Sequence, residues 1–154
     1  NKQAWLNLVQ RIGPDPLRDD ADADACRQSI GRSRGKIGAL LMNQSVIAGI
    51  GNIFRAEILH RLGIHPDRRG CDLTQEEVEQ IWDTAVELMQ VGVKYNRIIT
   101  KRRSEVDVPL TRLPAGERLL IYKKEYCGQC ASKVEHWELG GRKIFACTHC
   151  QSYP

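Results

Sequence analysis

The sequence lacks an apolar run that approaches the roughly 18 residues of a membrane helix, and no secretion signal opens it. It also lacks internal repeats and low-complexity tracts. Hydrophobic residues make up 42% and charged residues 27% of the 154 positions, which is typical of a soluble globular protein. This length suits one ordinary domain or two small modules that share a surface.

Acidic residues are missing from residues 94–103, although the net charge of the whole chain is only +4. This stretch carries five bases, Lys94, Arg97, Lys101, Arg102 and Arg103. A local basic cluster is expected where a protein binds phosphate. The alternative is an ordinary solvated loop, and the cluster alone does not decide between them.

Apolar periodicity and breaker residues predict a mainly helical chain. The predicted helices span residues 3–10, 23–31, 37–44, 52–62 and 75–92. The last of these is the clearest, because Thr74 and Glu77 form a capping box ahead of a continuous apolar stripe. Residues 95–117 show no clean period and are predicted to form a long exposed loop. We expect strands at residues 119–122, 134–139 and 142–147, the last two joined by a turn at Gly140 and Gly141.

Two C-x-x-C pairs, Cys127 with Cys130 and Cys147 with Cys150, are separated by sixteen residues. Each pair brings two thiolates together, and the spacer is long enough for a hairpin that returns the second pair to the first. Four thiolates form a closed structural Zn²⁺ site without an open position for catalysis. An iron–sulfur site or a redox pair is the alternative, against which the hairpin spacing argues. His149 is an alternative ligand.

The other two cysteines, Cys26 and Cys71, are expected to be small buried or half-buried thiols. Zinc binding supplies roughly 10–16 kcal/mol at such sites, whereas an isolated hairpin is marginal in water. The metal is therefore expected to fold the C-terminal tail.

Two further features are candidates for binding phosphate. Gly49 and Gly51 precede the predicted helix at Asn52, and free N–H groups at a helix start attract anions. Asn52 is expected to be the N-cap and to add a side-chain amide. Arg142 and Lys143 follow the predicted hairpin turn, and a guanidinium there can bind phosphate with two hydrogen bonds. A purely structural turn and an ordinary exposed arginine are the alternatives.

The sequence resembles a known family over most of its length. Residues 41–59 (LMNQSVIAGIGNIFRAEIL), followed by Gly63-Ile64-His65-Pro66, resemble the helix-two-turn-helix segment of the formamidopyrimidine-DNA glycosylase/endonuclease VIII family. The tail, with Arg142 five residues before Cys147, resembles that family's zinc finger. The sequence around Gly51 and Asn52 is slightly more similar to that of the endonuclease VIII branch, which mainly removes oxidised pyrimidines.

The resemblance implies a protein that removes oxidised bases from duplex DNA and then cuts the strand at the abasic site. Asn52 matches the asparagine that holds backbone phosphate. Arg142 matches the arginine that inserts at the damaged nucleotide, and Glu57 matches a position with a structural role. The implied protein is a monomer of the bacterial cytoplasm, associated with the nucleoid through DNA and with no membrane partner.

The family's chemistry resides on an N-terminal domain that begins with Pro-Glu, and the sequence begins Asn1-Lys2-Gln3 instead. We therefore expect a DNA-binding portion without catalytic residues, whose missing catalytic domain is its partner. The expected organisation is a helical helix-two-turn-helix domain at residues 1–94, a basic exposed loop at 95–117 and a four-cysteine zinc finger at 118–154. A self-contained zinc-ribbon nucleic-acid-binding or adaptor protein is the main alternative, and an intact enzyme with unrecognised catalytic residues is another.

Overall fold

The computed structural model describes the backbone of residues 1–154 and every side chain except those of Val9 and Gln10. Five α-helices and one two-stranded antiparallel sheet form the regular structure of this part of the chain. The helices are α1 (Lys2–Gln10), α2 (Ala23–Arg32), α3 (Ile37–Leu40), α4 (Asn52–Leu62) and α5 (Gln75–Tyr95). The strands are β1 (Glu135–Leu139) and β2 (Arg142–Ala146). The predicted fold class, mainly α with a small β module, is confirmed.

Local sequence explains where the two long helices begin and end. The predicted capping box of α5 is present, since the Thr74 hydroxyl accepts from the Glu77 N–H and the Glu77 carboxylate accepts from the Thr74 N–H. Helix α4 ends at Gly63, which adopts a left-handed conformation with φ of 68°. Both helices pack in the main core together with residues of α2 and of the turn before α4.

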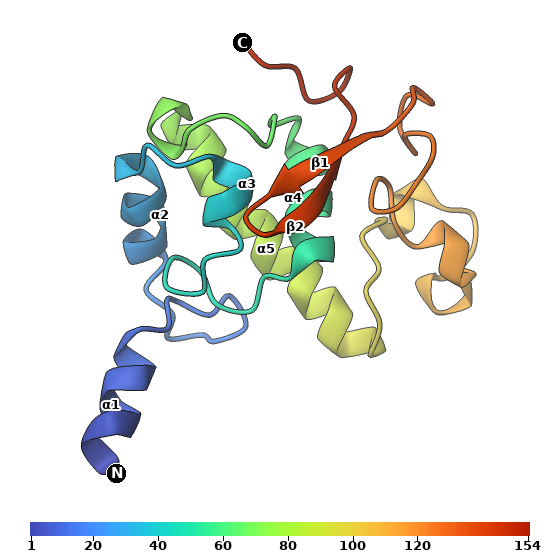
Figure 1. Cartoon of the computed structure of the whole chain (residues 1–154). Coiled ribbons are helices and arrows are strands. Elements are labelled where there is room, and N and C mark those ends of the chain that lie inside the picture. Colours follow the sequence, from blue (N-terminus) through green and yellow to red (C-terminus); the bar gives the residue numbers. More distant parts are fainter.

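Helix α4 lies between two hydrophobic cores, and Figure 1 shows the hairpin of β1 and β2 lying across it. Ile58 and Leu59 belong to the helical core, whereas Ala56 belongs to the core of the hairpin module. Six consecutive residues from Arg55 to His60 are buried, so α4 has no solvated face in its middle. The helix is therefore a wall shared by the helical part and the hairpin module.

Two predicted elements differ from the structure. Helix α3 ends at Leu40 instead of Gln44, because the chain tightens to i−3 hydrogen bonds and the Asn43 side chain accepts from the Ser45 N–H. Residues 119–122 do not form a strand, because the N–H groups that a sheet would use bond to a side chain of α4.

Residues 96–118 are largely irregular, with three short 3₁₀ turns at Arg103–Glu105, Leu110–Arg112 and Ala115–Glu117. The loop predicted at residues 95–117 is exposed only in part, because Ile99, Thr100 and Leu113 are buried. Helix α1 extends away from the rest of the molecule (Figure 1), and its Trp5 and Leu8 side chains are exposed. Among the described residues, no helix is both long and apolar enough to cross a lipid bilayer. The proposed boundaries at residues 94 and 117 stay a prediction.

Candidate metal centre and nucleic-acid interface

The four cysteines of the two C-x-x-C pairs form one cluster at the base of the hairpin. Their Sγ atoms all lie within 4.8 Å of one another. Cys130 Sγ lies 3.4 Å from Cys147 Sγ, and Cys127 Sγ lies 4.0 Å from Cys150 Sγ. Four sulfurs at about 2.3 Å from a tetrahedral ion would be about 3.8 Å apart, so the cluster matches the dimensions of a structural four-thiolate metal site.

Hydrogen bonds to the sulfur atoms fit this use. The Gln129 N–H approaches Cys127 Sγ at 3.3 Å, and the Cys150 N–H approaches Cys147 Sγ at 3.5 Å. The buried His60 Nε2 lies 3.1 Å from Cys127 Sγ, so this ring belongs to the surroundings of the site. N–H groups that point at thiolates stabilise their negative charge and orient them for a metal. His149, the alternative ligand, is exposed and lies outside the cluster.

Of the two remaining cysteines, only Cys26 fits the prediction. It is buried against α5 in the helical core, and burial raises the pKa of its thiol to about 11. Cys71 is exposed, contrary to the expectation of a buried or half-buried thiol, because it lies in a short 3₁₀ turn that packs only through Gly70. Neither side chain joins the metal cluster.

The hairpin turn is formed by Gly140 and Gly141, as predicted from the Gly-Gly pair. Both have positive φ, 66° and 79°, as the two-residue turn that best matches strand twist requires. Leu139 pairs with Arg142 immediately before and after the turn. The side chains of Arg142 and Lys143 are exposed. Figure 1 shows this turn beside α3, on the side of the hairpin away from residues 103–117.

The glycine-rich turn before α4 is braced by Gln44. Its side-chain oxygen accepts from the Gly49 N–H at 2.8 Å, and its amide donates to the Ile50 carbonyl at 3.2 Å. Gly49 has a φ of 84°, and Gly51 is exposed with open space around its Cα. The first helical hydrogen bond runs from Arg55 N–H to Gly51 carbonyl, so the N–H groups at the start of α4 have no helical acceptor.

The N-cap of α4 is Gly51, not Asn52 as predicted, and Asn52 is the first helical residue. The Asn52 side chain is used differently. Its Nδ2 donates to the Lys143 carbonyl at 2.9 Å, and its Oδ1 accepts from Arg55 Nε at 2.8 Å. The start of α4 and the strand after the hairpin turn therefore meet directly, 91 residues apart in sequence.

Arg55 and Glu57 are two buried charged residues that sequence reasoning did not place in the site. The Arg55 guanidinium donates to the carbonyls of Gly38, Leu139 and Arg142 at 2.6 to 2.9 Å. Burial lowers its pKa to about 10, with the charge of Arg142 as the second cause, so it stays protonated at neutral pH. The one signal in the sequence that could have identified Arg55 is a charged residue within the predicted helix at residues 52–62.

Glu57 holds the segment that leads into the four-cysteine cluster. Its carboxylate accepts from the N–H groups of Leu120, Ile121 and Tyr122 at 2.7 to 2.9 Å, and the Thr100 hydroxyl also donates to it. The resemblance implied a structural position for Glu57, and these bonds are consistent with it. Helix α4 thus fixes the module at two ends, through Arg55 at the hairpin turn and Glu57 at residues 120–122.

The basic cluster of residues 94–103 is not drawn into the site around Asn52 and Arg142. Arg102 pairs with Glu87 of α5 at 2.9 Å, and Arg103 donates to the Val106 carbonyl at 2.8 Å. Arg61, at the opposite end of α4 from Asn52, pairs with Glu105 at 2.9 Å. Among the described side chains, Arg102 is the one member of the cluster that forms an ion pair, and a role of this loop in binding phosphate stays a prediction.

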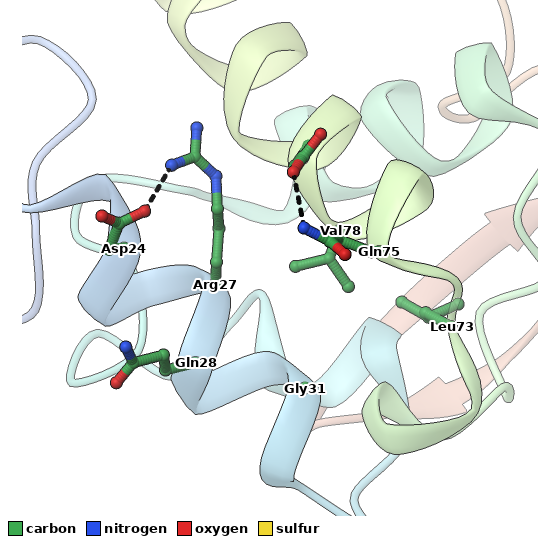
Figure 2. A pocket seen from close by; sticks show the side chains of 8 residues that line it. Asp24, Arg27, Gln28, Gly31, Leu73, Gln75 and Val78 are labelled. Atoms are coloured by element: carbon green, nitrogen blue, oxygen red, sulfur yellow. Dashed lines mark hydrogen bonds and ion pairs between the residues drawn. The ribbon is translucent and has the colours of Figure 1, made fainter.

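Figure 2 shows a separate pocket of about 390 Å³ between α2 and α5. Arg27 pairs with Asp24 across its rim at 2.8 Å, and the Gln75 amide donates to Glu79 at 3.2 Å. Val78 lies at its apolar floor (Figure 2). The pocket shares no residue with the cysteine cluster or the hairpin turn, so it is separate from the candidate site.

The sequence is similar to known DNA glycosylases over most of its length. The formamidopyrimidine-DNA glycosylase H2TH (helix-two-turn-helix) domain matches residues 12–104. Endonuclease 8 1 of Mycobacterium tuberculosis is 39% identical over 148 residues, which cover 95% of this chain and 55% of that protein. Formamidopyrimidine-DNA glycosylase of Desulforamulus reducens is 30% identical over 145 residues, which cover 93% of this chain and 52% of that protein.

A structural relative covers the hairpin module as well. The Lactococcus lactis formamidopyrimidine-DNA glycosylase, solved in complex with DNA that contains an abasic site, superposes with a TM-score of 0.79 at 26% identity. The match covers 99% of this chain and 56% of that one, so the chain spans about half the length of the relatives it matches. The chain belongs to the formamidopyrimidine-DNA glycosylase H2TH domain family, and the relatives above place its similarity in the glycosylase/endonuclease VIII group.

Proposed function

We propose that this chain is the DNA-binding portion of a base-excision-repair DNA glycosylase and AP lyase that acts on oxidised bases. The observation that carries the proposal is the direct contact between the start of α4 and the hairpin, through Asn52 Nδ2 and the Lys143 carbonyl at 2.9 Å. This contact brings two kinds of phosphate-binding group to one region. A similar chain of known structure binds DNA with an abasic site, which supports the same partner here.

The proposed contacts use groups that the protein leaves available. Asn52 has a second amide hydrogen beyond the one donated to Lys143, and the N–H groups that follow Gly51 lie at the start of α4. Arg142 and Lys143 carry exposed positive charges beside the turn. Such groups bind the backbone and not the base edges, so they hold a duplex in register without reading its sequence.

One structural Zn²⁺ ion is proposed at Cys127, Cys130, Cys147 and Cys150. The sulfur–sulfur distances of 3.4 and 4.0 Å support this assignment, as does the burial of Cys127 and Cys147. Zinc bound there stabilises the fold of the module and offers no open position to a substrate. The folded hairpin then holds Arg142 and Lys143 in place beside its turn.

No residue of this chain is proposed to break a bond in the substrate. Removal of a damaged base requires the nucleotide to be extruded from the stack, and clamping of the flanking phosphates supports that step. The greater similarity to endonuclease 8 1, 39% against 30% for the glycosylase from Desulforamulus reducens, favours an enzyme of the endonuclease VIII branch. The match to glycosylases over most of the chain argues against a self-contained adaptor protein.

Fluorescence anisotropy with a labelled duplex that carries an abasic-site analogue tests the binding roles. Arg142→Ala is expected to weaken binding about tenfold and to lower the slope of log affinity against log salt by about 0.9, because one phosphate contact is lost. Asn52→Ala is expected to weaken binding without changing the slope, because the amide carries no charge. Arg34→Ala, at an exposed arginine of the helical part, is the matched control. Unchanged affinity in both site variants would overturn the assignment.

Borohydride trapping with abasic-site DNA tests the absence of a catalytic role. We expect no covalent adduct with the purified 154-residue chain, because no nucleophilic amine of this chain is assigned to the reaction. An adduct that maps to one lysine would show that the chain itself performs the lyase step.

A further inference from the structure

The buried guanidinium of Arg55 lies directly beneath the hairpin turn. Its Nη1 donates to the Leu139 carbonyl at 2.6 Å, and its Nη2 donates to the Arg142 carbonyl at 2.9 Å. These carbonyls belong to the residues on either side of Gly140 and Gly141, so one planar group holds both strands of the turn. A guanidinium suits this task because its donors have a fixed geometry.

The same group sets the orientation of the Asn52 amide. Arg55 Nε donates to Asn52 Oδ1 at 2.8 Å. Because Nε can only donate, the oxygen of the amide must face Arg55 and the NH₂ group must face the hairpin, where it meets the Lys143 carbonyl at 2.9 Å. Asn52 is thereby held with its NH₂ group toward the hairpin, and the second amide hydrogen is left for a phosphate bound beside the turn.

The turn also packs closely against α3. A fourth hydrogen bond joins Arg55 Nη1 to the Gly38 carbonyl of α3 at 2.8 Å. A Cβ atom at Gly140 would lie 3.3 Å from Arg55 Nη1 and 3.2 Å from Ala39 Cα, so the backbone of the turn rests against both. The position of the turn is therefore defined by α3 and α4 together.

Arg55 achieves this without a carboxylate partner. It is 0% exposed, and among the described side chains it takes part in no ion pair. All four of its acceptors are neutral oxygen atoms. A buried charge of this kind contributes little stability by comparison with an apolar side chain of similar volume. Its distinctive contribution is geometric.

We propose that Arg55 is a positioning residue for DNA binding, which fixes the Asn52 amide and the Arg142 backbone relative to each other so that both contact the phosphates of one duplex. The proposal rests on the proposed function of Asn52 and Arg142. Arg55 itself is covered by the turn and touches no DNA.

A thermodynamic cycle tests this role in the zinc-loaded chain with the abasic-analogue duplex. Arg55→Met is expected to weaken binding about tenfold and to lower the salt slope by about 0.9, although Arg142 is still present, because Arg142 no longer meets its phosphate. In an Asn52→Ala/Arg142→Ala background, the same substitution is expected to change affinity less than about twofold. Arg55→Lys, which keeps the charge but not the planar fork, is expected to behave like Arg55→Met.

Arg68→Met is the matched control, since Arg68 is also largely buried and donates to Glu77 and to the Asp72 carbonyl, away from the hairpin. It should lower the unfolding midpoint without changing affinity or slope. Equal losses for Arg55→Met in both backgrounds, or wild-type binding by Arg55→Lys, would overturn the positioning role. If Arg55→Met does not fold with one zinc, the Arg55→Lys cycle decides. Wild-type binding by the Asn52→Ala/Arg142→Ala chain would instead overturn the proposed function, and the positioning role with it.

Discussion

Replacing Glu57 with glutamine removes the charge that holds residues 120–122 against α4. The carboxylate is 1% exposed and accepts from three successive backbone N–H groups, those of Leu120, Ile121 and Tyr122, and from the Thr100 hydroxyl. Oε1 faces Leu120 and Thr100, whereas Oε2 faces Ile121 and Tyr122. A glutamine keeps one of these oxygens and places an NH₂ group where the other was.

The magnitude follows from this geometry. If the amide oxygen stays near Leu120, the NH₂ group opposes the N–H groups of Ile121 and Tyr122, which lose their acceptor inside the protein. A buried donor without a partner costs about 1–3 kcal/mol, and the remaining bonds weaken because the acceptor is neutral. We expect the free energy of unfolding to fall by roughly 3–5 kcal/mol, a large part of the 5–15 kcal/mol of an ordinary domain.

Urea unfolding of the zinc-loaded chain, followed by far-ultraviolet circular dichroism, measures this loss. Glu125→Gln is the matched control, because Glu125 is exposed and close to the same module, and it should stay within about 0.5 kcal/mol of wild type. A loss below about 1 kcal/mol for Glu57→Gln would refute the reasoning, because it would show that residues 120–122 do not depend on a charged acceptor.

Three further outcomes are expected. A strong chelator should unfold the hairpin module but leave α5 helical, so the amide resonances of the hairpin should collapse into the narrow range of an unfolded chain while most helical ellipticity remains; an intact hairpin without metal would contradict this. Burial lowers the pKa of His65, whose Nδ1 accepts from the Asp67 N–H, so the unfolded chain takes up a proton first as the pH falls below about 6.5. Stability should then decrease by up to about 1.4 kcal/mol per pH unit, and His65→Phe should lose less stability than wild type between pH 7.5 and 5.5. Gly31→Ala should stabilise α2 by about 0.5–1 kcal/mol, since a Cβ there meets open space, whereas Gly140→Ala should destabilise by about 1–2 kcal/mol at its positive φ. Calorimetric unfolding of both glycine variants checks the sign.

Local signals in the sequence were sufficient for elements whose bounds depend on neighbouring residues. The capping box at Thr74 and Glu77 predicted the start of α5, and Gly63 predicted the end of α4. The Gly-Gly pair predicted the hairpin turn, and the C-x-x-C spacing predicted the cysteine cluster. The capping box and the glycine positions depend on contacts within a few residues of sequence. The cysteines could be placed because paired C-x-x-C motifs mainly bind metal.

Predictions failed where distant contacts compete with local preference. Asn52 has the side chain of an N-cap, but its amide bonds to Lys143 and Arg55 instead, so Gly51 takes the cap. The apolar run at residues 119–122 has the composition of a strand, yet its N–H groups bond to Glu57 on α4. Neither the Lys143 carbonyl nor the Glu57 carboxylate can be identified as a hydrogen-bond partner from periodicity, because periodicity reports only which face of an element is apolar.

The two buried charges of α4 also make the docking of the hairpin module directional. Arg55 offers only donors and therefore meets carbonyls, whereas the carboxylate of Glu57 offers only acceptors and meets N–H groups. A module docked the other way round would face donor with donor and acceptor with acceptor at both places. During folding, apolar packing alone would tolerate several orientations, but this polarity along one helix rejects all except one. Arg55 and Glu57 therefore define the direction of the module on α4, and the metal is expected to hold the module itself together.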